Sequence, residues 1–130
     1  TITDYLALEK IRYEDRLDWS IKIDPSCQKA QIPPMLLQTL VENGIKHGIS
    51  KSVKGGVIEI TAEKKEDRVY IRVINPGNLK TTKEPTEGLG LINSQNRLSL
   101  LYGETAQIDL QPLNKNQVCA SVTLPYLEEI

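Results

Sequence analysis

Apolar residues recur along the chain with two periods, one helical and one extended. Residues 4–17 carry apolar side chains three or four positions apart, which predicts an amphipathic helix. Its apolar side would comprise Tyr5, Leu6, Leu8, Ile11 and Leu17. Residues 17–24 then alternate between apolar and polar, which is typical of a strand with one buried face. A second helix is predicted over residues 35–47, and Gly48 is a natural helix end.

The middle of the chain predicts a β-hairpin followed by a long loop. Residues 57–63 and 68–74 alternate cleanly and are joined by a short polar stretch. Residues 75–88 then contain two prolines, two glycines and three threonines without an apolar period. Loops of this length inside a small domain are more often functional or mobile than structural.

The last third of the chain predicts a helix and a closing hairpin. The helix covers residues 89–102 and stops at Gly103. Its apolar side would comprise Leu91, Leu98 and Leu101. The hairpin covers 105–113 and 117–126. Helices combined with mostly antiparallel strands predict an α+β fold, a two-layer α/β sandwich with helices on one face of a mixed sheet.

Composition narrows the class of protein. The 130 residues fit one domain, and 39% hydrophobic with 25% charged residues is ordinary for a globular protein. A net charge of −1 gives no basic footprint for nucleic acid or an anionic membrane. No apolar run approaches the roughly 20 residues that span a bilayer. Cys27 and Cys119 lack metal-type spacing, so we expect two free, buried or partly buried thiols in a reducing compartment.

One polar cluster falls on the second predicted helix, within LVENGIKHG (40–48). Asn43, Lys46 and His47 are three and four positions apart, so they project from one helix face. An amide oxygen suits Mg²⁺, an ammonium group one turn later can neutralise phosphates, and a flat imidazole can stack on a base. The residues alone leave two interpretations open, a solvated helix face and a site for a magnesium-bound phosphate.

A second cluster combines glycines with the start of the third predicted helix. Asn75 and Gly77 end a strand, and Gly88 and Gly90 lie where the helix begins. Glycine lets backbone N–H groups approach a phosphate, and the helix N-terminus adds partial positive charge. Glycines also commonly begin helices, and the spacing matches neither a P-loop nor a dinucleotide-binding fingerprint.

Three ordered stretches give the chain a specific resemblance. IPPMLLQTLVENGIKHGI (32–49), VINPG (73–77) and EGLGLINSQNRLSLLYGE (87–104) resemble the ATP-binding domain of sensor histidine kinases, most of all the LytS-type branch. The wider superfamily includes gyrase, mismatch-repair and heat-shock chaperone ATPases. The resemblance covers nearly the whole chain and implies the Bergerat ATP-binding fold. It also implies that residues 1–16 end a helical dimerisation or linker segment and that 17–130 form the catalytic domain.

The resemblance assigns roles to the first cluster and to the strand end. Asn43 would hold Mg²⁺, Lys46 would contact the phosphates, and His47 would lie against the adenine. Asn75 stands where the family usually has the Asp that recognises the adenine amino group. Gly77 matches the first glycine of that motif.

The resemblance also assigns roles beyond Gly77. Residues 78–87 would be the ATP lid. Gly88, Leu89 and Gly90 would approach the phosphates through their backbone amides. Asn93 and Arg97 match polar positions of this branch, and a structural role for Arg97 is equally open.

Three departures from the family pattern bear on activity. The amide of Asn75 loses the charge-assisted part of the adenine bond, which lowers affinity by roughly tenfold. Leu79 replaces a second glycine, which stiffens the lid hinge. Hydrolytic members place a Glu four residues before the magnesium-binding Asn, where this chain has Thr39. Glu42 lies about 100° round the helix from Asn43, so we expect slow hydrolysis.

The function implied is that of the catalytic domain of a two-component sensor histidine kinase. It would present the γ-phosphate of Mg-ATP to a His on an upstream helix, for relay to an Asp of a response regulator, of the LytTR type in this branch. The resemblance implies that His47 would lie in the nucleotide pocket and would not be the acceptor. Because the chain begins with Thr1 in the middle of a helical pattern, we expect a piece of a longer protein.

Further expectations concern the parent protein and the alternatives. The parent would be a homodimer anchored in the cell membrane, with this domain on the cytoplasmic side. One alternative is a degenerate pseudokinase or interaction module with weak or no nucleotide binding, which Asn75 and Leu79 favour slightly. The other is a serine-phosphorylating anti-sigma factor of the same superfamily. The kinase-like N-terminal helix disfavours it.

Overall fold

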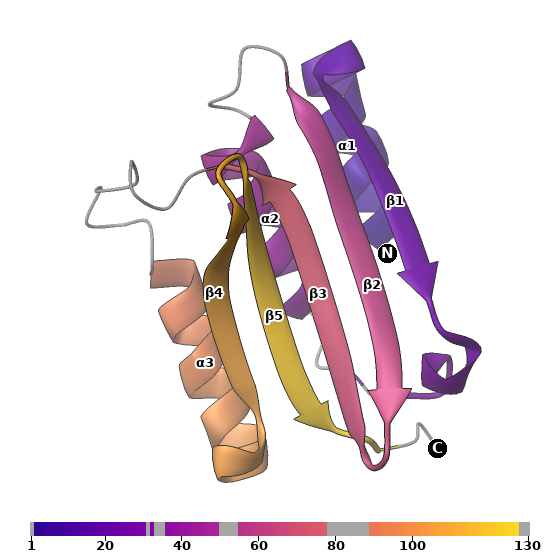
Figure 1. Cartoon of the computed structure of the whole chain (residues 1–130), viewed down its shortest axis with the longest axis vertical. Helices are drawn as coiled ribbons and strands as arrows, with labels where there is room; N and C mark the ends of the chain where they lie inside the picture. The colour runs from indigo at the N-terminus through magenta and orange to yellow at the C-terminus, as the bar shows by residue number, and fades with distance from the viewer. Residues whose placement is uncertain (1, 31, 33–35, 50–54, 78–88, 128–130) are drawn as a thin grey trace.

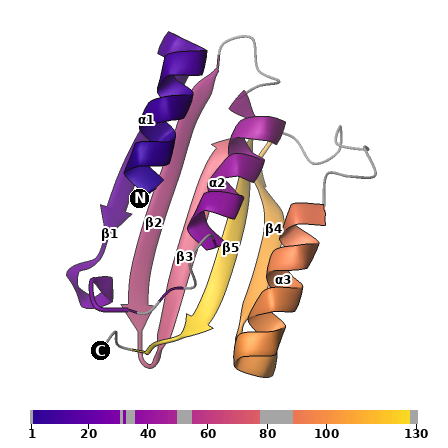
Figure 2. The same ribbon diagram turned by 180° about the vertical axis from the view of Figure 1, so that it is seen from behind.

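The computed structural model describes residues 2–30, 32, 36–49, 55–77 and 89–127. Within these residues five strands form one sheet in the order β1-β2-β3-β5-β4. The three helices α1, α2 and α3 all lie on one face of this sheet (Figures 1 and 2). The predicted two-layer α+β sandwich is therefore confirmed.

One parallel pair and three antiparallel pairs build the mixed sheet. β1 (Leu17–Ile23) runs parallel to β2 (Gly56–Lys65), and β2 pairs antiparallel with β3 (Arg68–Pro76). β5 (Gln117–Pro125) lies between β3 and β4 (Gln107–Asn114) and is antiparallel to both. Both predicted hairpins are confirmed. β3 continues to Pro76, so its last two residues come from the segment predicted as loop.

The helices follow the predicted order with shifted ends. α1 covers Ile2–Tyr13, α2 covers Leu36–His47 and α3 covers Leu89–Tyr102. α1 stops earlier than predicted because Glu14 takes a left-handed φ of 53°, which an α-helix cannot continue through. A 3₁₀ turn, Glu14–Arg16, then leads into β1. Two further 3₁₀ turns cover Pro25–Cys27 and Gly103–Thr105, and Gly103 ends α3 with a φ of 64°, as predicted.

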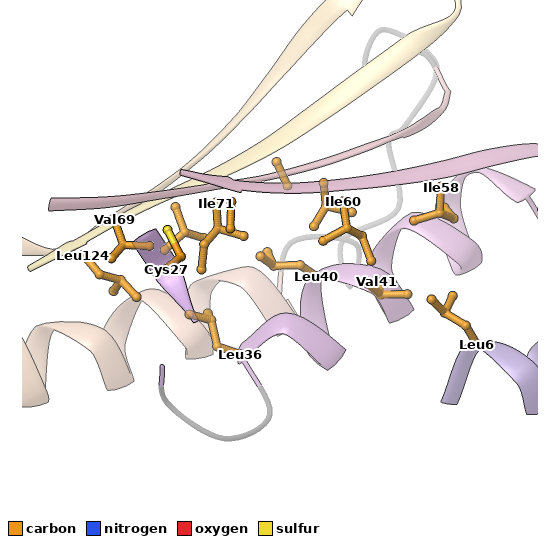
Figure 3. Packing of buried hydrophobic residues seen from close by; sticks show 14 of the residues in the cluster. Leu6, Cys27, Leu36, Leu40, Val41, Ile58, Ile60, Val69, Ile71 and Leu124 are labelled. Atoms are coloured by element: carbon orange, nitrogen blue, oxygen red, sulfur yellow. The ribbon is translucent and has the colours of Figure 1, made fainter. Parts of the chain in front are cut away.

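The core lies between the helices and the sheet (Figure 3). Alternate residues of β2 and β3 point toward the helices, including Ile58, Ile60, Val69 and Ile71, all at most 1% exposed. Leu36, Leu40, Val41 and Ile45 of α2 cover them, since α2 lies across the middle of the sheet. This burial supplies the main favourable term in folding and fixes α2 against β3.

Three predicted apolar contacts are wrong. Leu8 and Ile11 of α1 are 67% and 76% exposed, and Leu101 of α3 is 60% exposed. α1 and α3 lie over the outer strands of the sheet, so each covers it with a narrow stripe, represented by Leu6 and Leu98. Leu17, which both the helical and the extended pattern include, is buried as predicted and belongs to β1. The side chain of Leu91 lies outside the described residues.

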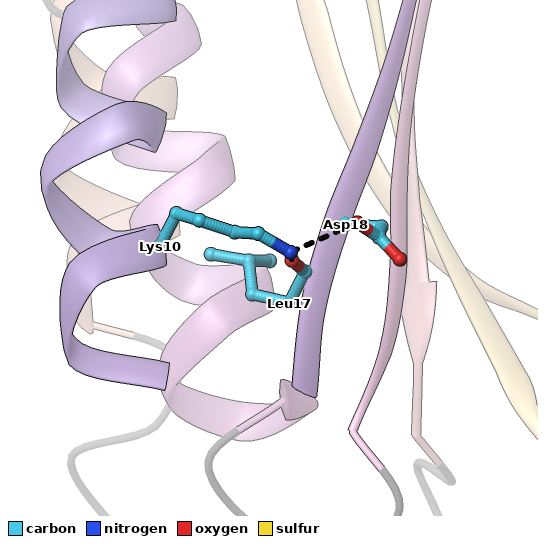
Figure 4. Close-up of polar contacts among 3 residues, drawn as sticks. All are labelled: Lys10, Leu17 and Asp18. Atoms are coloured by element: carbon cyan, nitrogen blue, oxygen red, sulfur yellow. Dashed lines mark hydrogen bonds and ion pairs between the residues drawn. The ribbon is translucent and has the colours of Figure 1, made fainter. Parts of the chain in front are cut away.

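Polar side chains fix α1 and α3 to the two edges of the sheet. Lys10 Nζ donates to the backbone carbonyl of Leu17 and, at 3.0 Å, to Asp18 Oδ1 (Figure 4). At the other edge Gln95 Oε1 accepts from the backbone N–H of Ile108 at 2.7 Å, which ties α3 to β4. Such a bond also occupies a donor of an edge strand that could otherwise pair with another chain.

The state of the two cysteines and the length of the helices can also be compared with the sequence expectations. Cys27 and Cys119 are both free and buried, as predicted, and burial raises the pKa of the Cys27 thiol. No helix in the described ranges is long and apolar enough to cross a membrane.

Candidate functional site

The predicted polar cluster lies at the border of the buried face of α2. Asn43 and His47 are half-buried, and Lys46 is exposed. Gly44 and Gly48 are buried and lie inside that border, toward the sheet. The helical spacing therefore brings three different polar groups to one rim, beside the point where α2 comes closest to β3.

Asn75 lies directly under α2. It is the one polar residue among the described positions that is fully buried, at 5% exposed. A Cβ atom on Gly44 would lie 3.1 Å from Asn75 Oδ1, and one on Gly48 would lie 2.8 Å from Asn75 Nδ2. The two glycines thus let the helix approach the strand closely enough to enclose this amide.

β3 ends one residue after Asn75, at Pro76. Asn75 Nδ2 donates to the carbonyl of Pro76 at 2.7 Å, and the N–H of Gly77 donates to the carbonyl of Asn116 at 2.9 Å. Gly77 has a φ of 153°, and a Cβ there would lie 3.8 Å from the carbonyl oxygen of His47. The strand end and the last turn of α2 therefore form one contiguous group.

The structure brings together five of the eight predicted site residues. Asn43, Lys46 and His47 come from α2, and Asn75 and Gly77 come from the end of β3. Leu89 and Gly90 form the first turn of α3, which contacts α2 and lies beside it in Figure 2. Gly88 and the predicted lid 78–87 lie outside the described residues, as do the side chains of Leu89 and Asn93. Arg97 is exposed.

Sequence reasoning missed the part played by Gly44 and Gly48. The sequence predicts only that Gly48 ends the helix and assigns Gly44 no role, although both glycines face the buried amide of Asn75. The signal was their spacing of four on the apolar side of the helix, which marks a line of close backbone approach. These glycines place the strand end against the polar rim.

The donor set around this rim suits Mg²⁺ bound with a phosphate. Mg²⁺ usually keeps several waters and takes only one or two protein oxygens besides phosphate oxygens. The half-buried amide of Asn43 can provide one such oxygen, and the exposed ammonium group of Lys46 is one turn of helix away. No three His, Cys, Asp or Glu side chains gather elsewhere in the described chain as a metal cage.

A separate hollow lies away from this cluster. Its volume is about 670 Å³, and its lining includes Lys22, Thr61, Tyr70 and Arg72, from the ends of β1 to β3. None of the predicted site residues lines it. It is an open depression on the sheet rather than an enclosed cavity, so size alone does not outweigh the chemistry gathered at α2 and β3.

Several known proteins are similar in sequence to this chain. Sensor protein LytS of Staphylococcus epidermidis is 34% identical over 96% of this chain and 23% of its own length. Sensor histidine kinase YpdA of Escherichia coli is 35% identical over 82% of this chain and 20% of its length. LytS of Oceanobacillus iheyensis is 31% identical over 94% and 23%. The chain thus spans about a quarter of the curated relatives it matches. No protein-family model matches it.

Solved structures share the fold. The nucleotide-free catalytic domain of histidine kinase ThkA matches 94% of this chain and 87% of its own, with a TM-score of 0.68 at 19% identity. Histidine kinase AdeS of Acinetobacter baumannii matches 96% of this chain and 63% of its own, with a TM-score of 0.65 at 11% identity. The fold is that of a histidine-kinase catalytic domain. Over the segment that it shares with the LytS proteins, the chain belongs to the LytS-type sensor histidine kinases.

Proposed function

We propose that this chain binds Mg-ATP and presents its γ-phosphate to a histidine on another helix of a two-component sensor kinase. The observation that carries the proposal is the juxtaposition of the α2 rim with the strand end at Asn75 and Gly77. Relatives named as sensor histidine kinases, which match most of the chain, support it. The chain then belongs with the kinases, as the catalytic and ATP-binding part.

Each residue of the group has a distinct task in this proposal. Asn75 Nδ2 is engaged with Pro76, so Oδ1 is the acceptor that would meet the adenine amino group. The imidazole of His47 would pack against the adenine ring, and Asn43 would give an oxygen to Mg²⁺. Bound Mg²⁺ would neutralise and align the phosphates. Lys46 would add a positive charge there, and the amides of Gly88, Leu89 and Gly90 at the start of α3 would bind phosphate oxygens.

Transfer requires little covalent chemistry from this chain. Phosphoryl transfer is mostly positioning and charge neutralisation, and both fit a polar rim beside a rigid sheet. Thr39, one helical turn before Asn43, is half-buried and cannot act as a general base at neutral pH. We therefore propose transfer to a protein histidine, with slow hydrolysis as a side reaction.

The proposal extends to the parent protein. The acceptor histidine would lie on a helix preceding this chain, in a homodimer anchored in the cell membrane with this domain on the cytoplasmic side. The phosphoryl group would then pass to an Asp of a response regulator of the LytTR type. The sensor-kinase names of the relatives support a regulator partner in general.

The test is calorimetric binding of ATP and ADP with and without Mg²⁺ to the wild type and to Asn43→Ala. The proposal predicts that Mg²⁺ strengthens ATP binding in the wild type and that Asn43→Ala removes this gain. Gln38→Ala is the matched control, because Gln38 carries an amide on the same helix but bonds to Glu42 at 2.9 Å. Absence of binding at millimolar ATP would overturn the proposal and favour the interaction-module alternative.

A further inference from the structure

The connection between α1 and β1 reaches the end of the nucleotide helix. Arg16, the last residue of the 3₁₀ turn, donates from Nη2 to the carbonyl oxygen of Ile49 at 3.1 Å. Ile49 is fully buried and lies two residues beyond His47. Ile49 follows the last helical residue, so its carbonyl oxygen is not one of those of α2 itself, but a cation close to a helix C-terminus is favoured by the helix dipole. Arg16 therefore supplies, from another element, a donor at the end of α2.

The backbone of Arg16 is itself closely held. Gly55 has a left-handed φ of 72°, and a Cβ there would lie 2.5 Å from Arg16 Cα and 2.6 Å from its carbonyl carbon. The next residue, Gly56, pairs with Leu17 at the start of the parallel β1–β2 ladder. Arg16 thus contacts the chain just after α2 through its side chain and the chain just before β2 through its backbone.

Further contacts fix the turn that carries Arg16. Its Cζ lies 5.9 Å from the centre of the Tyr13 ring, and Arg12 Cζ lies 5.4 Å from the same ring. Lys10 joins α1 to the first residues of β1 (Figure 4). Glu14 is held with a left-handed φ of 53°, a conformation that a non-glycine residue rarely adopts. A strained backbone conformation of this kind persists only where the surrounding contacts enforce it.

From these contacts we infer that Arg16 is a positioning residue for the nucleotide site, which sets the end of α2 and through it Lys46 and His47. The functional part of this inference rests on the proposed function. A shift of α1 would therefore displace Arg16 and, through its bond to Ile49, the end of α2. In the wild type α1 and the site are then coupled, and the coupling is lost when the bond to Ile49 is removed.

The test uses Arg16→Gln, Arg16→Lys and the matched control Arg12→Gln. Arg12 shares the Tyr13 ring, whereas the bond to Ile49 belongs to Arg16. His47 is the single histidine of the chain, so its imidazole proton signals in NMR report on the last turn of α2 alone. Mg-ATP affinity by calorimetry and thermal unfolding midpoints complete the set.

Arg16→Gln should shift the His47 signals without nucleotide and weaken Mg-ATP binding by about fivefold, the lower end of usual couplings between sites. Arg16→Lys keeps a charged donor and should recover part of both effects. Arg12→Gln should change neither. Equal effects of Arg12→Gln, or an unchanged His47 in Arg16→Gln, would overturn the inference. A His47 shift in Arg16→Gln when the wild type binds no Mg-ATP would support positioning and reject the proposed function.

Discussion

The close approach of α2 to the end of β3 predicts different effects of glycine-to-alanine substitution at two positions one helical turn apart, Gly44 and Gly48. At Gly44 a new Cβ would lie 3.1 Å from Asn75 Oδ1 and 3.2 Å from its Cβ and Cγ, a tight contact with a side chain that can yield slightly. Alanine gains about 1 kcal/mol over glycine inside a helix. This gain offsets the tight contact, so Gly44→Ala should change the free energy of unfolding by less than about 0.5 kcal/mol.

At Gly48 the same Cβ meets two backbone oxygens that cannot move aside, as well as the side chain of Asn75. It would lie 2.6 Å from the carbonyl oxygen of Gly44 and 2.8 Å from Asn75 Nδ2, and closer still to the carbonyl oxygen of Pro76. Relieving the overlap requires both a separation of the helix from the strand and an adjustment of the last turn of α2, and overpacking of this kind costs about 1–3 kcal/mol. Gly48 has no left-handed φ, so the predicted loss is steric.

Urea unfolding followed by circular dichroism measures both variants. Gly103→Ala is the control, because Gly103 has a φ of 64° and a Cβ there would meet no atom within 4 Å. It should lose about 1 kcal/mol from backbone conformation alone. If Gly48→Ala unfolds within about 0.5 kcal/mol of the wild type, the enclosure of Asn75 between α2 and β3 is wrong.

Three further predictions concern other parts of the molecule. Gln95→Ala should lower the free energy of unfolding by about 1 kcal/mol and speed hydrogen exchange at the Ile108 amide, since its acceptor on α3 is lost; unchanged exchange would contradict this. Burial, with the carboxylates of Glu9 and Glu42, raises the pKa of Tyr5 to about 12. The stability linked to Tyr5 is therefore fully present below about pH 10 and lost as the pH rises to about 12, so Tyr5→Phe should flatten the alkaline fall in the urea midpoint; an equally steep fall would refute it. Both thiols should resist an aromatic disulfide reagent until urea unfolds the chain, because both are buried; fast native reaction of either would show that it is accessible.

Local patterns predicted most elements of the fold because the helical and extended periods are distinct in this chain. The two hairpins and the positions of α2 and α3 follow from alternation, helical spacing and the glycine at residue 103. The order of the strands in the sheet could not be predicted from local patterns. The parallel pairing of β1 with β2 depends on contacts between residues 39 positions apart, such as Leu17 with Gly56, which no local window contains.

The exposure of Leu8, Ile11 and Leu101 was beyond local prediction for a similar reason. Periodicity identifies the apolar side of a helix, but the width of the buried stripe depends on where the helix lies over the sheet. The candidate site was likewise predictable only in part. Its polar residues could be named from their types and spacing, whereas the enclosure of Asn75 by Gly44 and Gly48 required the packing of helix on strand.

The most direct test of the central claim is to follow side-chain NMR signals while Mg-ATP is added to the wild-type chain. The account predicts that the imidazole of His47 and the side-chain amide of Asn75 shift together with one dissociation constant, because α2 and the end of β3 bound the same site. Signals of Thr61 and Tyr70, in the hollow on the sheet, should stay unchanged. Shifts at Thr61 and Tyr70 with His47 and Asn75 unmoved would place the nucleotide elsewhere and contradict the account.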